Sequence, residues 1–294
     1  MSSPSPATPV TGRFAPSPTG DLHFGSLIAA VASFLEAKSA GGRWLVRIDD
    51  IDPPREQPGS AERILRDLDR FGLKPDAPVL YQGSRTEAYR AAVTRLQERG
   101  LAFPCGCSRG DLPESGVYPG TCRAGLAPGK TPRSVRLKVS GEPVRFTDRI
   151  QGPQEENLRE AVGDFVIWRA DDLPAYQLAV VVDDAWQEVS EVVRGADLLD
   201  STARQVYLQG CLDLPTPVYA HHPVALDGDG RKLSKRDGSD PVARLRPARA
   251  LWLALRFLGQ DCPQDLDLDS AWRWALAHWR LDRVPRSREA ALAL

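Results

Sequence analysis

His23 and Gly25 are the first residues along the chain whose types and spacing could do chemistry. They form a His-x-Gly pair behind a loop containing Pro16 and Pro18, where a short apolar stretch gives way to a helical pattern. A helix N-terminus offers unpaired N–H groups and partial positive charge to phosphate, and glycine lets the backbone approach closely. The pair therefore indicates a phosphate site, although a lone His-x-Gly more commonly marks a structural turn.

Lys232 and Lys235 form a second candidate pair, three residues apart in a Gly/Asp-rich segment that comes after an apolar strand pattern. Two ammonium groups on one loop could neutralise triphosphate charge as it develops during transfer. Taken alone, the pair would more often be an exposed basic turn.

Three of the five cysteines gather in one Gly/Pro-rich segment, as Cys105, Cys107 and Cys122. Thiolates are soft ligands that suit zinc, and a tetrahedral structural site needs a fourth ligand, which a His or Asp from elsewhere could supply. Three reduced thiols without metal are the alternative. We favour structural Zn²⁺, because compact Cys-x-Cys knuckles rarely have another reason to exist, and we expect Cys211 and Cys262 to be plain thiols.

The elements that must position these groups can be predicted from the spacing of apolar residues. A strand over 12–15, a helix over 25–40 and a strand over 44–48 form a crossover of the kind found in parallel, nucleotide-binding sheets. Ser84 and Glu87 form a capping box that predicts the start of the next helix.

The rest of the chain alternates between strand-like and helical patterns. We predict two strands joined by a turn, two further strands, a helix, a last strand and a helical C-terminal region. Their residues are 135–139, 144–146, 165–168, 178–182, 201–211, 218–220 and everything beyond 241.

Composition and charge narrow the function classes. The 294 residues are 42% hydrophobic and 26% charged with a net charge of −1, which is typical of a globular protein and gives no global field for a polyanion. A basic patch over 123–149 could be a solvated strand surface or an RNA-facing one. The Ser/Pro-rich start is unlike a signal peptide, and 27–35 is too short to span a bilayer. With the clustered cysteines, this favours a cytoplasmic protein without membrane contact.

Several motifs occur one after another in a specific order. They are RFAPSPTG at 13–20, LVRIDDID at 45–52, YQLA at 176–179 and VRGADLL at 193–199. Together with His23-x-Gly25 and the KLSKR run at 232–236, they resemble the class I aminoacyl-tRNA synthetases of the glutamyl type. The resemblance extends from about residue 10 to residue 240.

The chain differs from full glutamyl-tRNA synthetases in the region beyond the KLSKR run. That family carries a large helical anticodon-binding region there, for which the remaining chain is too short. The length, the Cys-x-Cys insertion and the IDPPR run at 51–55 resemble the glutamyl-queuosine tRNA(Asp) synthetases. Those short paralogues make glutamyl-adenylate from ATP and L-glutamate and attach glutamate to the queuosine base at the wobble position of tRNA(Asp).

The resemblance implies an α/β fold, with a Rossmann-type parallel-sheet catalytic domain that contains a zinc-knuckle insertion and is followed by a short helical region. The predicted segments are a disordered tail (1–10), the first half of the catalytic domain (11–100), the insertion (101–160), the second half with the KLSKR loop (161–240) and a helical C-terminal region without a full anticodon-binding domain (241–294).

The resemblance also implies roles for individual residues. Arg13 and Arg194 would bind the glutamate carboxylates, for which a guanidinium fork is suited, and Tyr176 would bind glutamate from a facing strand. The implied glutamate-binding set is Arg13, Phe14, Ala15, Pro16, Ser17, Asp49, Tyr176 and Arg194. Relatives usually carry a glutamate where Asp49 stands, so the pocket closes slightly, a water bridges the gap, or Asp50 shares the binding of the substrate ammonium.

The implied ATP site consists of His23, Gly25, Ser26 and Lys235, and the implied catalytic residues are His23, Lys232 and Lys235. Ser26 replaces the second histidine of the family signature, and Mg²⁺ would accompany ATP. In the resembled family a tyrosine completes the zinc site, which assigns Tyr118 to Cys105, Cys107 and Cys122.

Two other functions remain open at this point. A truncated glutamyl-tRNA synthetase would charge the 3′ end of tRNA(Glu), and a catalytically silent paralogue would only bind RNA. The presence of His23, Lys235, Arg13 and Arg194 argues against the silent paralogue. We expect a monomer. The acceptor nucleotide cannot be derived from residue chemistry, and neither can the role of the C-terminal tryptophans and arginines.

Overall fold

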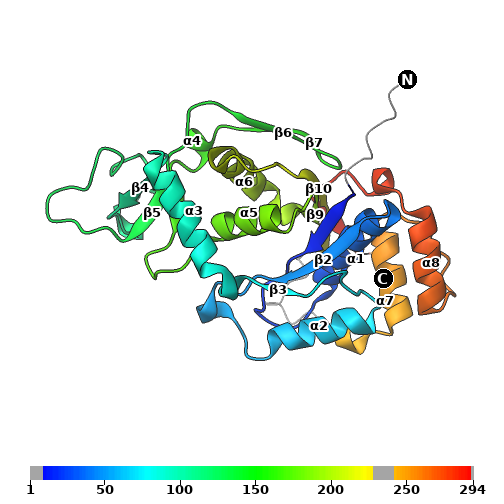
Figure 1. Ribbon diagram of the computed structural model, residues 1–294. Helices are drawn as coiled ribbons and strands as arrows, with labels where there is room; N and C mark the ends of the chain where they lie inside the picture. The colour runs from blue at the N-terminus through cyan, green and yellow to red at the C-terminus, as the bar shows by residue number, and fades with distance from the viewer. Residues whose placement is uncertain (1–8, 228–241, 293–294) are drawn as a thin grey trace, which may run out of the picture.

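The computed structural model describes residues 9–227 and 242–292, so Lys232, Lys235 and most of the predicted tail lie outside the described residues. A seven-stranded sheet in the order β3-β2-β1-β9-β10-β6-β7 forms the centre (Figure 1). All neighbouring strands run parallel except β6 and β7, as expected for a nucleotide-binding sheet. The strands are β1 Thr11–Phe14, β2 Arg43–Ile48, β3 Leu80–Tyr81, β6 Val144–Asp148, β7 Gly152–Glu156, β9 Glu191–Gly195 and β10 Val218–His222.

The predicted crossover from β1 to β2 is confirmed, with α1 (Phe24–Ser39) between the two parallel strands. Leu27, Val31 and Leu35 recur at helical spacing on α1 and are fully buried. His23 is the N-cap residue and accepts a hydrogen bond from the Ser26 N–H, which places the start of the helix at the end of the β1 loop.

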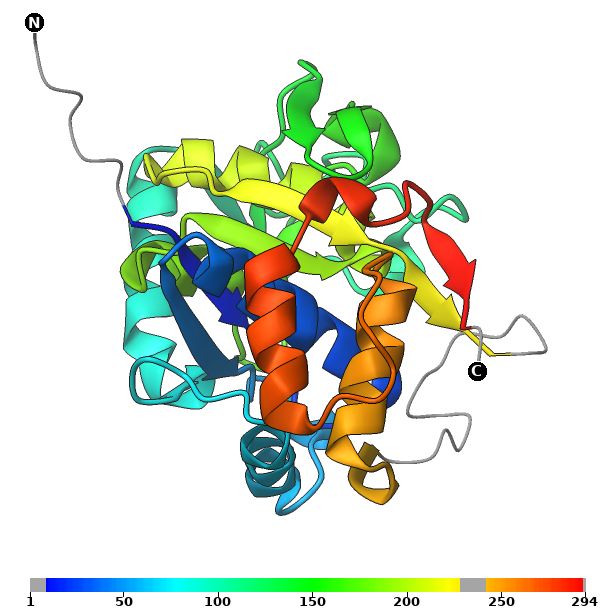
Figure 2. The same ribbon diagram turned by 90° about the vertical axis from the view of Figure 1, so that its right-hand side faces the viewer.

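Helices cover both faces of the sheet, and their apolar residues belong to two large hydrophobic clusters. One cluster joins α1, α2, α7 and α8, and the other joins α3, α5 and α6. Figure 2 shows α7 (orange) and α8 (red) side by side in front of α1 (blue). The helices are α2 Ser60–Arg70, α3 Thr86–Glu98, α4 Leu158–Ala161, α5 Tyr176–Trp186, α6 Leu199–Leu212, α7 Pro247–Phe257 and α8 Leu268–His278. No helix within the described ranges is long and apolar enough to cross a membrane.

Two smaller sheets flank the central one. The first contains β4 (Ala102–Cys105), β5 (Ser134–Leu137) and β8 (Val166–Trp168) in antiparallel pairs, and the second pairs β11 (Val224–Leu226) with β12 (Glu289–Ala291). Short 3₁₀ turns connect several elements, at Pro53–Arg55, Gln82–Arg85, Arg109–Asp111, Ala196–Leu198, Val242–Arg244 and Leu281–Arg283.

The predicted hairpin across residues 135–146 is wrong. β5 pairs with β4 and β8, whereas β6 joins β10 and β7 in the central sheet. Alternation of apolar residues predicts a strand but carries no information about which strand it pairs with. The sequence therefore indicated the two strands but not their partners. The residue boundaries predicted for the segments of the chain stay a prediction.

The predicted strand over 178–182 is also wrong, because these residues lie in α5. Leu178, Ala179, Val180 and Val181 are all buried, between the sheet and its neighbouring helices. A helix that is apolar on nearly every side has no periodicity to distinguish it from a buried strand, and its valines favour the wrong choice.

Two smaller predictions also need correction. Ser84 does not cap α3, because it lies inside the 3₁₀ turn Gln82–Arg85 and its hydroxyl donates to the Tyr81 carbonyl at 2.7 Å. The chain is not helical to its end, since β12 adds a strand beside β11. Local sequence cannot show that a late segment pairs with a distant strand.

Two C-terminal tryptophans, Trp272 and Trp279, attach the last part of the chain to α1 and to the end of α2. Trp272 is buried and donates to the Phe71 carbonyl at 2.8 Å, and Trp279 donates to the Glu36 carboxylate at 2.6 Å. Both bonds satisfy the indole N–H while the ring adds apolar contact area, so these two residues are structural.

Candidate active site

A cavity of about 530 Å³ opens at the carboxyl ends of β1, β9 and β10. Ligands of parallel α/β sheets bind at this edge, and the volume suits a small substrate. The predicted site residues on its wall are Arg13, Phe14, Ala15, Pro16, Ser17, His23, Gly25, Ser26, Tyr176 and Arg194. Asp49 is not on the wall, and Lys232 and Lys235 lie outside the described residues.

The N-terminus of α1 forms one side of the cavity, with Gly25 and Ser26 in its first turn. His23 Nδ1 accepts from the Ser26 N–H at 3.3 Å, so Nε2 of the neutral ring carries the proton and donates to Ser26 Oγ at 2.9 Å. The helix dipole and the first-turn N–H groups favour an anion here. For His23 to donate to a phosphate oxygen, Nε2 must turn away from Ser26.

Tyr176 reaches the cavity from a different element than predicted. It is the first residue of α5 and not part of a facing strand. The correction changes the local electrostatics, because the N-terminus of α5 adds partial positive charge beside the arginines.

Arg13 lies in a buried network of alternating charges. Its guanidinium donates to both oxygens of Asp184 at 3.3 Å. Asp184 also accepts from Arg47 at 2.6 Å, and Arg47 donates to Asp49 at 2.7 Å. Although burial raises it, Arg13 and Arg47 hold the pKa of Asp184 below its ordinary value, so this carboxylate stays charged.

Asp49 accepts a hydrogen bond from Arg47 and is not among the residues that line the cavity. Burial raises the pKa of Asp49 to about 6, against the opposing effect of Arg47. Asp50 accepts from the Gly83 N–H at 2.8 Å. Neither side chain is among the residues that line the cavity, so how the substrate ammonium is bound stays a prediction.

Arg194 lies on β9 and is held by neutral groups. Its Nε donates to His221 Nε2 at 2.9 Å, and its Nη2 donates to Thr202 Oγ1 at 2.9 Å and Gln205 Oε1 at 2.8 Å. Its Nη1 is buried and has no hydrogen-bond partner within residues 9–227 and 242–292. Burial lowers the pKa of Arg194, so a carboxylate ligand would relieve a real desolvation cost.

His222, Asp197 and Arg55 also line the cavity and were missed by sequence reasoning. His222 Nδ1 donates to the Pro223 carbonyl at 2.9 Å, which leaves a buried Nε2 lone pair as an acceptor, and burial lowers the pKa of this ring. The available signals were weak. Asp197 lies inside the VRGADLL motif, and His222 is one of two adjacent histidines in a chain with four.

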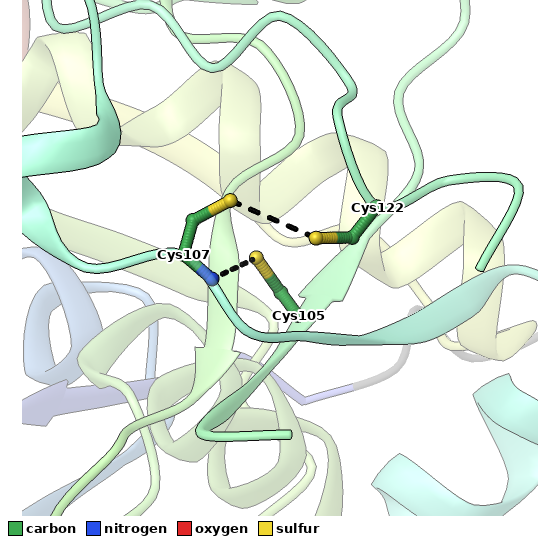
Figure 3. Close-up of side chains that lie close together, drawn as sticks. All are labelled: Cys105, Cys107 and Cys122. Carbon is green, nitrogen blue, oxygen red and sulfur yellow. Dashed lines mark hydrogen bonds between the residues drawn. The ribbon is translucent and has the colours of Figure 1, made fainter. Parts of the chain in front are cut away.

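Cys105, Cys107 and Cys122 come together as predicted, with all three sulphur atoms within 4.8 Å of one another (Figure 3). The sulphurs of Cys107 and Cys122 are 3.6 Å apart. Tetrahedral Zn–S bonds of about 2.3 Å place two sulphurs about 3.8 Å apart, so the donor set fits zinc. Cys105 is the last residue of β4, in the sheet formed by β4, β5 and β8, and Cys107 and Cys122 lie in the segment between β4 and β5.

Tyr118 is also at this cluster. Its hydroxyl accepts from the Cys122 N–H at 2.8 Å and lies 3.4 Å from Cys105 Sγ. Gly163, at φ +67°, permits this approach, since a Cβ there would collide with the Tyr118 backbone. Although burial raises it, hydrogen bonds from Tyr118, the Cys107 N–H and Arg136 lower the pKa of Cys105 to about 7, whereas burial and the neighbouring Cys122 raise the pKa of Cys107 to about 11. Of these two thiols, Cys105 is therefore the one that more readily becomes a thiolate.

The family model for tRNA synthetases class I (E and Q), catalytic domain, matches residues 9–116 and 123–245. A relative named glutamyl-Q tRNA(Asp) synthetase, from Aromatoleum aromaticum, is 52% identical over 97% of this chain and 93% of its own length. The chain belongs to the glutamyl-Q tRNA(Asp) synthetase family. A second relative of that name, from Dechloromonas aromatica, is 52% identical over 95% of this chain and 97% of its own.

The fold of this class I synthetase is shared with solved glutamate-specific enzymes. A glutamate tRNA ligase from Elizabethkingia meningosepticum, in complex with its amino acid, gives a TM-score of 0.83 at 25% identity. The similarity covers 97% of this chain and 67% of that one. A glutamate-tRNA synthetase from Elizabethkingia anophelis gives 0.82 at 26% identity. The enzyme is therefore a ligase with the predicted α/β synthetase fold.

The basic patch predicted over 123–149 is less available to RNA than the sequence suggested. Arg123 forms an ion pair with Asp164 at the insertion, and Arg136 is buried against Cys105 and Tyr118. The other paired cations and their carboxylates are Lys130 with Asp111, Arg145 with Glu155, and Arg149 with Glu36 and Glu191. For the exposed cations Lys130, Arg145 and Arg149, these ion pairs favour the solvated-surface interpretation.

Proposed function

We propose that the enzyme activates L-glutamate with ATP to glutamyl-adenylate and transfers glutamate to the queuosine base at the wobble position of tRNA(Asp). The observation that carries the activation step is Arg194, a residue that lines the same cavity as Arg13 and the N-terminus of α1 and whose buried Nη1 has no hydrogen-bond partner among the described residues. Cationic groups for carboxylates and a helix start for phosphates thus share one wall. The names of the relatives support the acceptor.

The chemistry requires no enzyme nucleophile. A glutamate carboxylate oxygen attacks the α-phosphorus of ATP. The bond from that phosphorus to the oxygen that bridges to the β-phosphorus breaks, and pyrophosphate leaves. A hydroxyl of the acceptor nucleotide then attacks the acyl carbon, its proton is released, and AMP leaves. Arg13, Arg194 and Tyr176 would hold the glutamate so that this oxygen faces the phosphate beside α1, and positioning of this kind supplies most of the rate.

The nucleotide would lie against the first turn of α1, at His23, Gly25 and Ser26, with Lys232 and Lys235 supplying further positive charge. Mg²⁺ would accompany ATP and screen its phosphates when bound. We further propose that the enzyme is a monomer and works in the cytoplasm, where tRNA and ATP are found together.

We propose that Cys105, Cys107, Tyr118 and Cys122 hold one structural zinc ion, which would fix the insertion without taking part in the reaction. The test is the metal content of the purified protein, with about one zinc per chain expected. Cys122→Ser should lose the metal, whereas Cys262→Ser, at a buried thiol far from the cluster, should keep it. Equal zinc content in both variants, or none in the parent protein, would reject the site.

The glutamate acceptor is tested by incubating the protein with ATP, labelled glutamate and tRNA that contains or lacks queuosine, and then digesting the tRNA to nucleosides. Label on the queuosine nucleoside, absent when queuosine is absent, is the expected result. Label on the 3′-terminal adenosine irrespective of queuosine would instead establish a synthetase that charges the 3′ end of tRNA. The experiment includes this outcome because the fold is similar to that of a glutamate tRNA ligase. No label and no glutamate-dependent pyrophosphate exchange would reject both activities.

A further inference from the structure

Behind Arg194 lies a buried chain of polar groups that the reaction described above does not use. His221 on β10 contacts Arg194 through Nε2 at 2.9 Å and contacts Asp148, at the end of β6, through Nδ1 at 2.6 Å. Asp148 is 1% exposed, His221 0% and Arg194 4%. Three parallel strands of the central sheet, β6, β10 and β9, therefore align a carboxylate, an imidazole and a guanidinium.

The chemistry of arginine fixes the tautomer of His221. A guanidinium only donates hydrogen bonds, so Nε2 must accept from Arg194 and cannot carry a proton. The imidazole proton is then on Nδ1 and donates to Asp148 Oδ2. The other oxygen of Asp148 accepts three backbone N–H groups, from Ile150 at 3.0 Å, Gln151 at 2.8 Å and His221 at 3.1 Å.

The remaining contacts of Arg194 determine which nitrogen is left for a ligand. Nη2 is occupied by Thr202 and Gln205, and Gln205 is in turn held by its own donation to Gln177 at 2.9 Å. With Nε and Nη2 both engaged, the guanidinium plane cannot rotate without breaking these hydrogen bonds. Nη1 is buried and has no hydrogen-bond partner in the part of the chain that the structure describes, and Arg194 is a residue of the cavity wall.

We propose that His221, oriented by Asp148, is a positioning residue that fixes the Arg194 guanidinium for the substrate carboxylate and leaves its charge unneutralised. This inference rests on the proposed activation of glutamate. A carboxylate in direct contact with Arg194 would orient it equally well but would compete with the substrate for its charge. A neutral imidazole supplies the acceptor without that competition, and Asp148 ensures that Nε2 is the lone pair.

Two substitutions of His221 separate the contacts at Nε2, with Arg194 at 2.9 Å and Thr202 Oγ1 at 3.3 Å, from the contact of Nδ1 with Asp148. The amide of glutamine reaches the position of Nε2 and keeps an acceptor for Arg194, whereas the shorter asparagine reaches the position of Nδ1 and keeps only the contact with Asp148. In glutamate-dependent ATP–pyrophosphate exchange with tRNA present, His221→Asn should raise the KM for glutamate about 10- to 100-fold, as expected for a lost hydrogen bond to a charged group. The KM for ATP should stay within about twofold, and His221→Gln should recover most of the loss.

Asp148→Asn is the second variant, because it keeps the shape of the side chain. Its amide oxygen can still accept the backbone N–H groups, so its NH₂ must face Nδ1 and drive the imidazole proton to Nε2, against Arg194. The KM for glutamate should again rise while the KM for ATP does not. His278→Asn, at an exposed histidine on α8, is the matched control and should match the parent protein in both constants.

The outcomes are distinguishable. Equal KM values for glutamate in the parent protein, His221→Asn and Asp148→Asn would overturn the positioning role while leaving the proposed function intact. A parallel rise in both KM values, or equal losses in His221→Asn and His221→Gln, would show a purely structural histidine and also overturn it. If His221→Asn does not fold, judged by circular dichroism, Asp148→Asn decides. No exchange by the parent protein would overturn the proposed function, and the role of Arg194 with it.

Discussion

Arg13 and Arg194 face the same cavity from adjacent strands, but their charges are balanced in opposite ways. Arg13 shares Asp184 with Arg47, so the fold itself supplies its counterion. Within the part of the chain that the structure describes, Arg194 has no carboxylate at ion-pair distance and is held by His221, Thr202 and Gln205. A buried cation without a counterion costs stability, and a site can recover that cost as affinity when an anionic substrate binds.

Arg13 and Arg194 therefore have different roles, although the sequence motifs predict the same role for both. The Arg13 side is charge-neutral before substrate arrives and holds strands and helix together. The Arg194 side holds a buried cation whose counterion would be the substrate carboxylate. Arg47 also has one nitrogen without a hydrogen-bond partner among the described residues, but Arg47 does not line the cavity, and Asp49 and Asp184 both pair with its charge.

The largest effect is expected on stability at the Arg13 side. Asp184→Asn removes the carboxylate from two buried guanidinium groups and should lower the free energy of unfolding by about 3 to 5 kcal/mol, measured in urea at pH 7. Asp213→Asn is the matched control, since Asp213 also binds two arginines, Arg95 and Arg99, but at the surface. Its loss should be about 1 kcal/mol or less, and equal losses at both positions would contradict the buried network.

A slightly smaller effect is expected on affinity at the Arg194 side. Arg194→Met should raise the KM for glutamate about 100- to 1,000-fold, because a buried ion pair with the substrate is lost. The free energy of unfolding should be unchanged or higher, since the variant no longer buries an unpaired cation. A large loss of stability with little change in KM would place the two arginines in the same class and break the comparison.

The two sides should also respond to pH in opposite directions. Burial lowers the pKa of His221 to about 4, although the hydrogen bond to Asp148 opposes this. Below pH 6.5, His221 is protonated in the unfolded chain but stays neutral in the folded protein until the pH reaches about 4. The contribution of the neutral His221 to the free energy of unfolding is therefore lost as the pH falls from 6.5 toward about 4. Relative to His221→Gln, the parent protein should lose about 3 kcal/mol across this range, measured by urea unfolding at each pH. A constant difference would show that His221 does not stay neutral.

The smallest effect is expected from Asp49, on the Arg13 side. Its pKa is raised from 3.8 to about 6, so its contribution is fully present below pH 3.8 and is lost as the pH rises to about 6. Compared with Asp49→Asn, the parent protein should become less stable by about 2 to 3 kcal/mol between these limits, as seen in the same unfolding experiments. A slope of the same sign as that of His221 would contradict the assignment.

The cavity residues were largely predictable because they lie in continuous motifs. The run from Arg13 to Ser26 forms the end of β1, the loop and the start of α1 without interruption, so sequence neighbours remain spatial neighbours. The cysteine cluster was predictable for a similar reason, since thiols at this spacing have few other uses. Tyr176 was correctly assigned to the cavity but on the wrong element, because its helix is buried on nearly every side.

The groups that hold the arginines could not be predicted. Asp184 is 171 residues from Arg13, and Asp148 is 73 residues from His221, and no local pattern links the members of either pair. The same limit explains the false hairpin, since β5 and β6 are close in sequence but belong to different sheets. Partner choice depends on which surfaces pack together across the whole domain.

The sequence by itself determined which chemical groups this enzyme brings to its substrate, and the order of strand, loop and helix that carries them. Those features are local, because helix capping, backbone freedom at glycine and the amphipathic period act over a few residues. Only the tertiary structure decided that Arg13 is neutralised and Arg194 is not. Charge balance in a buried site is set by distances between residues far apart in the chain, and the packing of the helices against the sheet fixes those distances.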